Sequence, residues 1–139
     1  MILTDTGPIV ALIDIDDAHY THCFTYVKSI RRGNLIVPSS CFTEAMHLLY
    51  RAGGYRLQAD LWRARETGLV SIHESTAVEY DRMSALMDIY RDAPMDQADA
   101  AVVSAAEALN TDVVFTIDPH FYAYQTRNGP LQVVPNRRA

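Results

Sequence analysis

The chain of 139 residues lacks the features of several specialised classes of protein. Its two cysteines, Cys23 and Cys41, allow at most one disulfide, so a disulfide framework is excluded and a reducing cytoplasm is the expected compartment. It contains no run of about 18 apolar residues, so no membrane span is predicted. The first ten residues have no basic region and include Asp5, so no signal peptide is expected.

The sequence also lacks a strong bias toward any class of residue. Hydrophobic residues make up 49% of the chain and charged residues 21%, which excludes a disordered or collagen-like protein. A chain of this length buries roughly two-thirds of its unfolded surface, which is enough for a hydrophobic core. The sequence has no repeat, linker or low-complexity segment. Residues 1–139 are therefore expected to form a single domain.

Positive charge is scarce, because the net charge is −5, and this balance by itself argues against nucleic-acid binding. Residues 74–99 hold seven acids and two arginines, so this segment alone accounts for the excess. Eleven of the twelve basic residues are arginines, which favour bidentate contacts with phosphate or carboxylate. Local surpluses of arginine lie at 51–65 and at 127–138.

Short apolar runs alternate with helical patterns along the whole chain. The strands are expected at 2–5, 35–37, 69–72, 113–118 and 131–134, and the helices at 8–13, 19–32, 39–52, 55–66, 77–90 and 96–109. Glycine or proline bounds most of these segments. The alternation predicts an α/β domain with a mainly parallel central sheet.

Five acids occupy positions that such a fold would bring together. Asp5 and Asp118 end apolar runs, and Glu44 lies in the first turns of a predicted helix. Asp96 and Asp99 are three residues apart at the start of another helix, which places them on one side. Strands of a parallel sheet end where the following helices begin, and ligands bind at that edge. The acids could therefore converge on one cleft.

A cluster of carboxylates suits Mg²⁺ or Mn²⁺, which prefer hard oxygen ligands and assist phosphodiester hydrolysis. Each acid also has a structural interpretation. Asp96 is a good helix N-cap, and Asp99 and Glu44 are favoured in a first helical turn by the helix dipole. Asp5 and Asp118 each precede a turn containing proline. The residues alone leave both interpretations open.

Four segments in this order resemble the PIN-domain nucleases, particularly the VapC-like toxins of bacterial and archaeal toxin–antitoxin pairs. The resemblance spans residues 2–135. The segments are Ile2-Leu3-Thr4-Asp5-Thr6-Gly7, a helical Glu44, Pro94-Met95-Asp96-Gln97-Ala98-Asp99-Ala100, and Phe115-Thr116-Ile117-Asp118 followed by Phe121.

The resemblance implies a three-layer α/β/α sandwich and a Mg²⁺-dependent endoribonuclease, with Mn²⁺ as a substitute, that leaves 5′-phosphate ends. It also implies a homodimer inhibited by a cognate antitoxin. By motif, the metal-binding quartet is Asp5, Glu44, Asp99 and Asp118, with Asp5 and Asp99 as the firmest ligands. Asp96 matches an additional acid, and Thr116 matches a hydroxyl residue before the last acid.

Two other functions are considered. The first is a catalytically silent PIN-like module that binds RNA or protein and keeps its acids for helix capping and solubility. The second is a haloacid-dehalogenase-like phosphatase, which needs an acid two residues after the first, where Gly7 stands.

Two other groups of residues each have more than one interpretation. The segment 51–65 interleaves arginines with Tyr55 and Trp62, which suits an RNA surface or, as we favour, contact with a partner subunit or antitoxin helix. His19, His22 and Cys23 have helical spacing but lack further soft ligands, so a surface or packing role is expected.

Overall fold

The computed structural model describes residues 1–136, so Arg137 and Arg138 of the C-terminal arginine surplus lie outside the described residues. Seven strands are assigned in this part of the chain: β1 (Ile2–Thr4), β2 (Leu35–Pro38), β3 (Val70–His73), β4 (Val113–Phe115), β5 (Gln125–Thr126), β6 (Gly129–Pro130) and β7 (Gln132–Val134). The helices are α1 (Thr6–Ile13), α2 (Tyr20–Lys28), α3 (Ser39–Gly53), α4 (Tyr55–Glu66), α5 (Ala77–Ile89), α6 (Gln97–Ala108) and the short 3₁₀ helix η1 (Pro119–Tyr122).

Five strands form a central parallel sheet in the order β3-β2-β1-β4-β7. The chain builds outward from β1 through β2 to β3, and then returns to the other side of β1 to add β4. The strand order therefore reverses between β1 and β4, and a crevice for ligands opens at such a point in α/β sheets. The predicted α/β fold with a mainly parallel sheet is confirmed.

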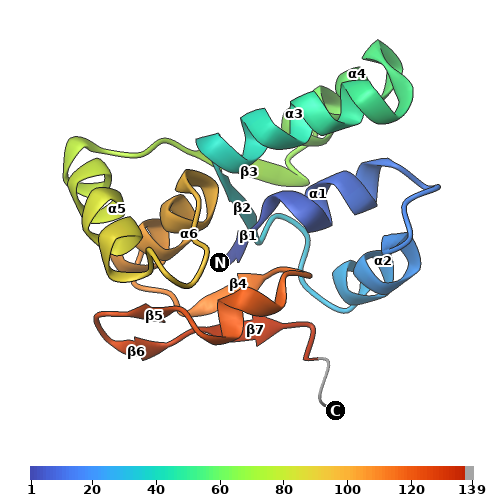
Figure 1. Ribbon diagram of the computed structural model, residues 1–139. Helices are drawn as coiled ribbons and strands as arrows, with labels where there is room; N and C mark the ends of the chain where they lie inside the picture. The colour runs from blue at the N-terminus through green and yellow to red at the C-terminus, as the bar shows by residue number, and fades with distance from the viewer. Residues whose placement is uncertain (137–139) are drawn as a thin grey trace.

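Helices cover both faces of this sheet. Figure 1 shows α5 and α6 on one side of the strands and α1 and α2 on the other. Helix α6 packs against β1, β2 and β4, and on the opposite face the ring of Tyr26 on α2 packs at a tilt against Phe115 of β4, with 4.8 Å between ring centroids. This arrangement confirms the predicted α/β/α sandwich.

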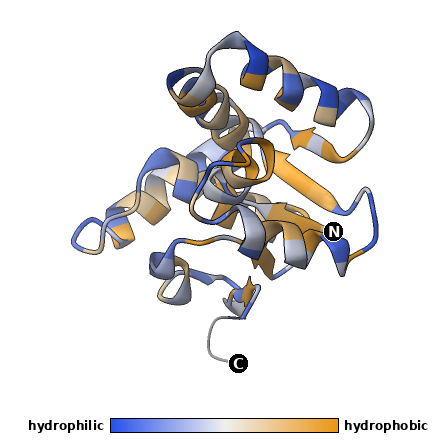
Figure 2. Ribbon diagram, turned by 90° about the vertical axis from the view of Figure 1, so that its right-hand side faces the viewer, coloured by the Kyte–Doolittle hydropathy of each residue, from blue (hydrophilic) through white to orange (hydrophobic). Residues whose placement is uncertain are grey.

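The strands are apolar because both of their faces are covered. Leu3, Val37 and Val114 have no exposed surface. Figure 2 shows the central strands mainly in the hydrophobic colour, while the helices around them carry hydrophilic segments. Continuous apolar strands are typical of parallel sheets covered by helices. No helix in residues 1–136 combines the length and apolar character needed to cross a bilayer.

Some predicted boundaries are wrong, and local side-chain hydrogen bonds explain two of them. The strand expected to reach Asp118 ends at Phe115, because the Thr116 hydroxyl accepts a hydrogen bond from the Asp118 N–H at 3.0 Å and turns the chain. The helix expected to reach residue 32 ends at Lys28, where the Ser29 hydroxyl donates to the Tyr26 carbonyl at 2.6 Å.

Candidate functional site

The five predicted acids line one pocket at the carboxyl edge of the sheet. This pocket has a volume of about 340 Å³, and we call it the acidic pocket. The acids on it are Asp5, Glu44, Asp96, Asp99 and Asp118. They follow the ends of β1 and β4, lie on the second turn of α3, or lie at the start of α6. The topology thus brings together residues that are up to 113 positions apart in the sequence.

Asp5 is the most deeply placed of these acids, with 7% of its surface exposed. It caps α1: its Oδ1 accepts from the Thr6 N–H at 2.8 Å, and its Oδ2 accepts from the Thr116 hydroxyl at 2.9 Å. Burial raises the pKa of Asp5 to about 6, and the negative charges of Asp118 and Glu44 add to this rise against the lowering effect of the two hydrogen bonds.

Thr116 is the one predicted site residue that does not line the acidic pocket. It is 2% exposed and lies behind Asp5, where its hydroxyl donates to Asp5 and accepts from the Asp118 N–H. Asp118 in turn caps η1 by accepting from the His120 N–H at 2.9 Å. Thr116 therefore links two of the acids and fixes their relative position.

Asp96 and Asp99 form a capping box at the start of α6. The Asp96 side chain accepts from the Asp99 N–H at 2.8 Å, and Asp99 Oδ2 accepts from the Asp96 N–H at 3.2 Å. The interpretation of Asp96 as an N-cap is confirmed by this geometry. Burial raises the pKa of Asp99 to about 7, and the charges of Asp96, Asp5 and Asp118 contribute to the rise.

Glu44 enters the pocket from α3, one turn after Cys41. It is exposed, and its Oε2 accepts from the Thr6 hydroxyl at 3.4 Å. The same hydroxyl lies 3.5 Å from the Cys41 carbonyl oxygen. Thr6 therefore joins the start of α1 to the start of α3 at the pocket wall.

Sequence reasoning missed three residues around this pocket. Asp17 lines it, although its carboxylate also accepts from the His19 N–H at 2.8 Å. The buried Cys41 thiol lies 3.8 Å from Asp5 Oδ1, and the Tyr124 hydroxyl lies 3.4 Å from Asp99 Oδ2. The position of Cys41 one helical turn before Glu44 was a usable signal, whereas nothing in the sequence links Tyr124 to the acids.

The donor set of the acidic pocket fits a hard divalent cation. Among the described residues that line it, there is no lysine, arginine or histidine to balance the carboxylates. Within residues 1–136, however, no three acidic, histidine or cysteine side chains already form a ligand cluster. Carboxylate oxygens without thiolate or imidazole partners suit Mg²⁺ or Mn²⁺.

Position 7 leaves no room for the second acid of a phosphatase. A Cβ atom on Gly7 would lie 2.8 Å from Ile117 Cγ1, so Ile117 would have to move to admit any side chain. Both residues line the acidic pocket. The close approach of α1 to this segment is therefore a physical reason for glycine here.

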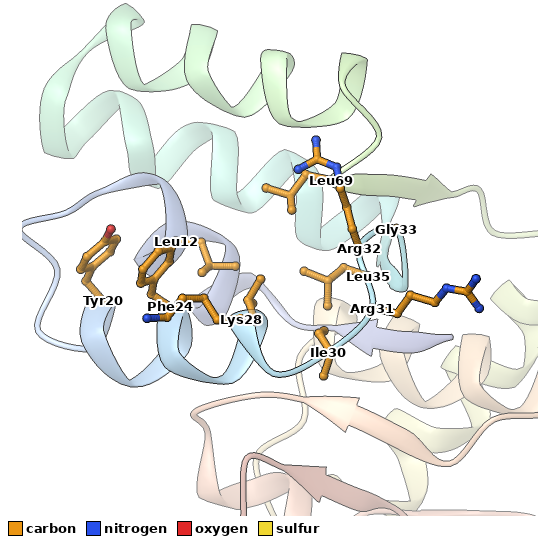
Figure 3. A pocket seen from close by; sticks show the side chains of 11 residues that line it. Leu12, Tyr20, Phe24, Lys28, Ile30, Arg31, Arg32, Gly33, Leu35 and Leu69 are labelled. Carbon is orange, nitrogen blue, oxygen red and sulfur yellow. The ribbon is translucent and has the colours of Figure 1, made fainter.

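A second pocket has the opposite chemistry, and we call it the apolar pocket (Figure 3). It has a volume of about 430 Å³ and lies between α1, α2 and the starts of β2 and β3. Figure 3 shows Tyr20 and Phe24 side by side on α2, and their rings stack at 5.5 Å. Its lining residues are Leu12, Tyr20, Phe24, Val27, Lys28, Ile30, Arg31, Arg32, Gly33, Leu35 and Leu69.

The tyrosine- and arginine-rich segment lies at the end of α3 and along α4. Tyr50, Tyr55 and Trp62 are 59%, 73% and 44% exposed, and the Trp62 ring also packs against Phe42 at 5.1 Å. Contact of this surface with RNA or with a protein partner stays a prediction. His19 and His22 are exposed while Cys23 is buried.

Comparison with known proteins agrees with this fold. The chain is similar to VapC20 of Mycobacterium tuberculosis, a sarcin–ricin loop cleaving toxin, with a TM-score of 0.80 and 18% sequence identity, covering 88% of this chain and 94% of that chain. It is also similar to VapBC2 of Rickettsia felis bound to a DNA fragment from its promoter, with a TM-score of 0.66 and 16% identity, covering 96% and 98% of the two chains.

A toxin–antitoxin complex of Klebsiella pneumoniae gives a TM-score of 0.66 and 14% identity, covering 85% of this chain and 87% of that chain. At these identities the solved structures show a shared fold. No curated protein matches the chain. The PIN-domain family model matches residues 2–126, which is most of the sequence. The chain therefore belongs to the PIN-domain family.

Proposed function

We propose that the chain is a divalent-metal-dependent endoribonuclease and the toxin of a toxin–antitoxin pair. The observation that carries this proposal is the acidic pocket, where acids from four separate segments meet at the edge of the sheet. Membership of the PIN-domain family and the likeness to solved VapC structures support the ribonuclease assignment.

The cation would be Mg²⁺, with Mn²⁺ as a substitute, held by Asp5, Asp99, Asp118 and Glu44. When bound, it positions a phosphate, activates water for hydrolysis and stabilises the leaving oxygen. Burial, with the neighbouring acids as a further cause, raises the pKa of Asp5 to about 6 and that of Asp99 to about 7, and a bound cation would favour the ionised form of both carboxylates.

The chain's own residues orient these acids. The Thr6 N–H and the Thr116 hydroxyl hold the two oxygens of Asp5, so its carboxylate is fixed by two elements at once. Glu44 is exposed and held only by the long contact from the Thr6 hydroxyl, so it is the acid that we expect to orient the attacking water. Asp96 supports Asp99 through the capping box.

The acidic balance of the chain does not argue against an RNA substrate once these acids are assigned to a cation. The four proposed ligands account for most of the net charge of −5, and the remaining surface is nearly neutral and rich in arginine. The likeness to VapC20, a sarcin–ricin loop cleaving toxin, supports a structured RNA as substrate.

A cognate antitoxin belongs to this proposal, supported by the similarity to toxin–antitoxin complexes, and a homodimer belongs to it as what the family resemblance implies. The apolar pocket offers a surface for the antitoxin. Its floor is aliphatic and aromatic, and its only charged lining residues in the described chain are the cations Lys28, Arg31 and Arg32. This lining suits an amphipathic segment that carries acidic side chains beside apolar ones.

The direct test is cleavage of total RNA by the purified chain, with mapping of the ends produced. We expect cleavage that leaves 5′-phosphate ends in Mg²⁺ or Mn²⁺ and that stops in EDTA. Cleavage that persists in EDTA would contradict the metal dependence. Coexpression with the product of a small reading frame adjacent to its gene tests the toxin role, with copurification and loss of cleavage as the expected result.

The alternative remains a catalytically silent PIN-like module that binds RNA or protein. The capping interactions of Asp5, Asp96 and Asp118 favour it, because each acid has a structural role without a cation. RNA binding without cleavage, in the presence of millimolar Mn²⁺, would select this alternative.

A further inference from the structure

Tyr124 is a buried residue next to the acidic pocket that has no role in the proposed function so far. Its side chain is 1% exposed, and its ring lies between those of Tyr90 and Phe121, each 5.1 Å away between centroids in an edge-to-face arrangement. Edge-to-face packing of this kind fixes the plane of a ring. The phenol hydroxyl is therefore held in one place, at the start of α6.

The hydroxyl touches two groups in the segment that carries the proposed ligand Asp99. It donates to the Pro94 carbonyl oxygen, and it lies 3.4 Å from Asp99 Oδ2. Residues 91–94 are exposed, and Met95 is the buried residue next to them. Tyr124 thus connects a largely exposed loop to the carboxylate that follows it.

Within residues 1–136, the Asp96 N–H and the Tyr124 hydroxyl approach the same oxygen of the Asp99 carboxylate. Oδ2 accepts from the Asp96 N–H at 3.2 Å and meets the Tyr124 hydroxyl at 3.4 Å, while Oδ1 takes part in neither contact. Such an arrangement turns one oxygen toward the protein and leaves the other for a ligand. Because the single phenol proton goes to Pro94, the Asp96 N–H is the donor that orients Oδ2, and Tyr124 acts on Asp99 by fixing the segment that leads into α6.

The Tyr124 hydroxyl can act as a hydrogen-bond donor at neutral pH. A tyrosine phenol has an ordinary pKa of about 10, so it keeps its proton at neutral pH. A neutral phenol adds no charge to the acidic pocket.

We infer that Tyr124 is a positioning residue, whose hydroxyl holds the Pro94–Asp99 segment, and through it the Asp99 carboxylate, in the orientation that binds the cation. This inference rests on the proposed function, since it assumes that Asp99 is a ligand. The residue acts through Asp99 and does not itself meet the cation or the RNA.

The test compares Tyr124→Phe with Tyr90→Phe. Each substitution removes one hydroxyl, and the Tyr90 hydroxyl accepts from the Gln125 N–H at 3.0 Å in the same aromatic cluster. Titration with Mn²⁺ in a calorimeter is expected to show about tenfold weaker binding for Tyr124→Phe and a change of less than about twofold for Tyr90→Phe. Equal affinities of wild type and Tyr124→Phe, or an equal loss in both variants, would overturn the inference.

A spectroscopic measurement on the wild-type chain tests the inference even if Tyr124→Phe does not fold. Addition of Mn²⁺ is expected to change the near-ultraviolet absorption of tyrosine, because the carboxylate beside the Tyr124 hydroxyl changes its charge environment. Tyr90→Phe should keep this signal. Its absence in a wild-type protein that binds Mn²⁺ would overturn the inference and leave the proposed function standing. A wild-type chain that neither binds Mn²⁺ nor cleaves RNA would overturn the proposed function itself.

Discussion

Helices α5 and α6 begin with the same local motif but differ in charge. At α5, Thr76 is the cap, and the Glu79 carboxylate accepts a hydrogen bond from the Thr76 N–H at 2.9 Å. At α6 both partners are acids, Asp96 and Asp99. The Thr76–Glu79 box contains one charge, and His73 lies 2.7 Å from the Glu79 carboxylate. The two acids of the α6 box lie on a pocket with further acids and without a basic lining residue among those described.

The pKa values of the acids at the third position of the two boxes, Glu79 and Asp99, shift in opposite directions. Glu79 is only 4% exposed, yet hydrogen bonds from Thr76 and His73 outweigh the effect of burial and lower its pKa. At Asp99, burial and neighbouring acids raise the pKa to about 7. Both boxes are therefore closed by hydrogen bonds of the folded chain, but the α6 box holds a carboxylate whose ionisation the surroundings oppose. A perturbed pKa of this kind is typical of a functional site.

The largest expected effect comes from removing the charge of Asp99. Asp99→Asn is expected to lower RNA cleavage at least about 100-fold, because a metal ligand contributes several kcal/mol to the transition state and each 1.36 kcal/mol is a factor of ten. Stability in EDTA should not fall, because the amide oxygen can still accept from the Asp96 N–H.

The matched control for this variant is Asp88→Asn, which removes an exposed acid that pairs only with Arg91 among the ion pairs of the described chain. It is expected to cleave RNA like the wild type. Full activity in Asp99→Asn would contradict the site assignment.

The equivalent change at α5 should affect stability and not activity. Glu79→Gln is expected to lower the free energy of unfolding by about 1–2 kcal/mol, because a buried charge-assisted hydrogen-bond network is weakened. Urea unfolding measures this loss, and Glu74→Gln, which changes an exposed neighbour, is the control. A Glu79→Gln variant that is as stable as the wild type would show that the α5 box contributes little.

The two boxes should also respond to pH with opposite signs. The pKa of Asp99 is raised to about 7 from about 3.9 in an unfolded chain, so in EDTA its contribution to stability is complete below about pH 4 and is lost as the pH rises to about 7. The pKa of Glu79 is lowered, so its contribution is present above the unfolded pKa of about 4.3 and is lost as the pH falls through the folded pKa.

Urea unfolding in EDTA across this range tests the difference. Between pH 4 and 7, Asp99→Asn should show a smaller decline in stability than the wild type, because the variant keeps the contribution of Asp5, with its pKa of about 6, and loses that of Asp99. Identical curves for the two proteins would mean that Asp99 titrates normally.

The smallest effect is expected when the α6 box is given the neutral cap of the α5 box. Asp96→Thr keeps a capping oxygen and removes one of the charges that raise the pKa of Asp99, so stability in EDTA should rise by about 0.2–0.5 kcal/mol. Mn²⁺ affinity decides the second role of Asp96. An affinity close to that of the wild type means that Asp96 is a cap, and a loss of tenfold or more means that it is also a ligand.

The longer strands and helices were predictable from the sequence, because each of them buries an apolar face that shows as a local pattern of residues. The two-residue strands β5 and β6 were not predicted, since segments this short carry no periodic pattern. Their turn depends on Gly129 at a φ of 120° and on the Thr126 hydroxyl, which donates to the Gly129 carbonyl oxygen at 3.0 Å.

The proposed ligands were found from their places at strand ends and helix starts, which the local pattern reveals. The residues that contact these ligands could not be predicted, because their contacts join distant parts of the chain. Thr116 reaches Asp5 across 111 positions, and Tyr124 reaches Asp99 across 25. The pKa of Asp99 depends on burial and on Asp5 and Asp118, which meet it only after folding.

The central claim is that the acidic pocket binds a divalent cation through Asp99. The most direct measurement is calorimetric titration of the metal-free chain with Mn²⁺, beside Asp99→Asn. We expect saturable binding to the wild type at or below millimolar concentration and at least about tenfold weaker binding to the variant. Absence of binding to the wild type at millimolar Mn²⁺, or equal binding to both proteins, would contradict the account.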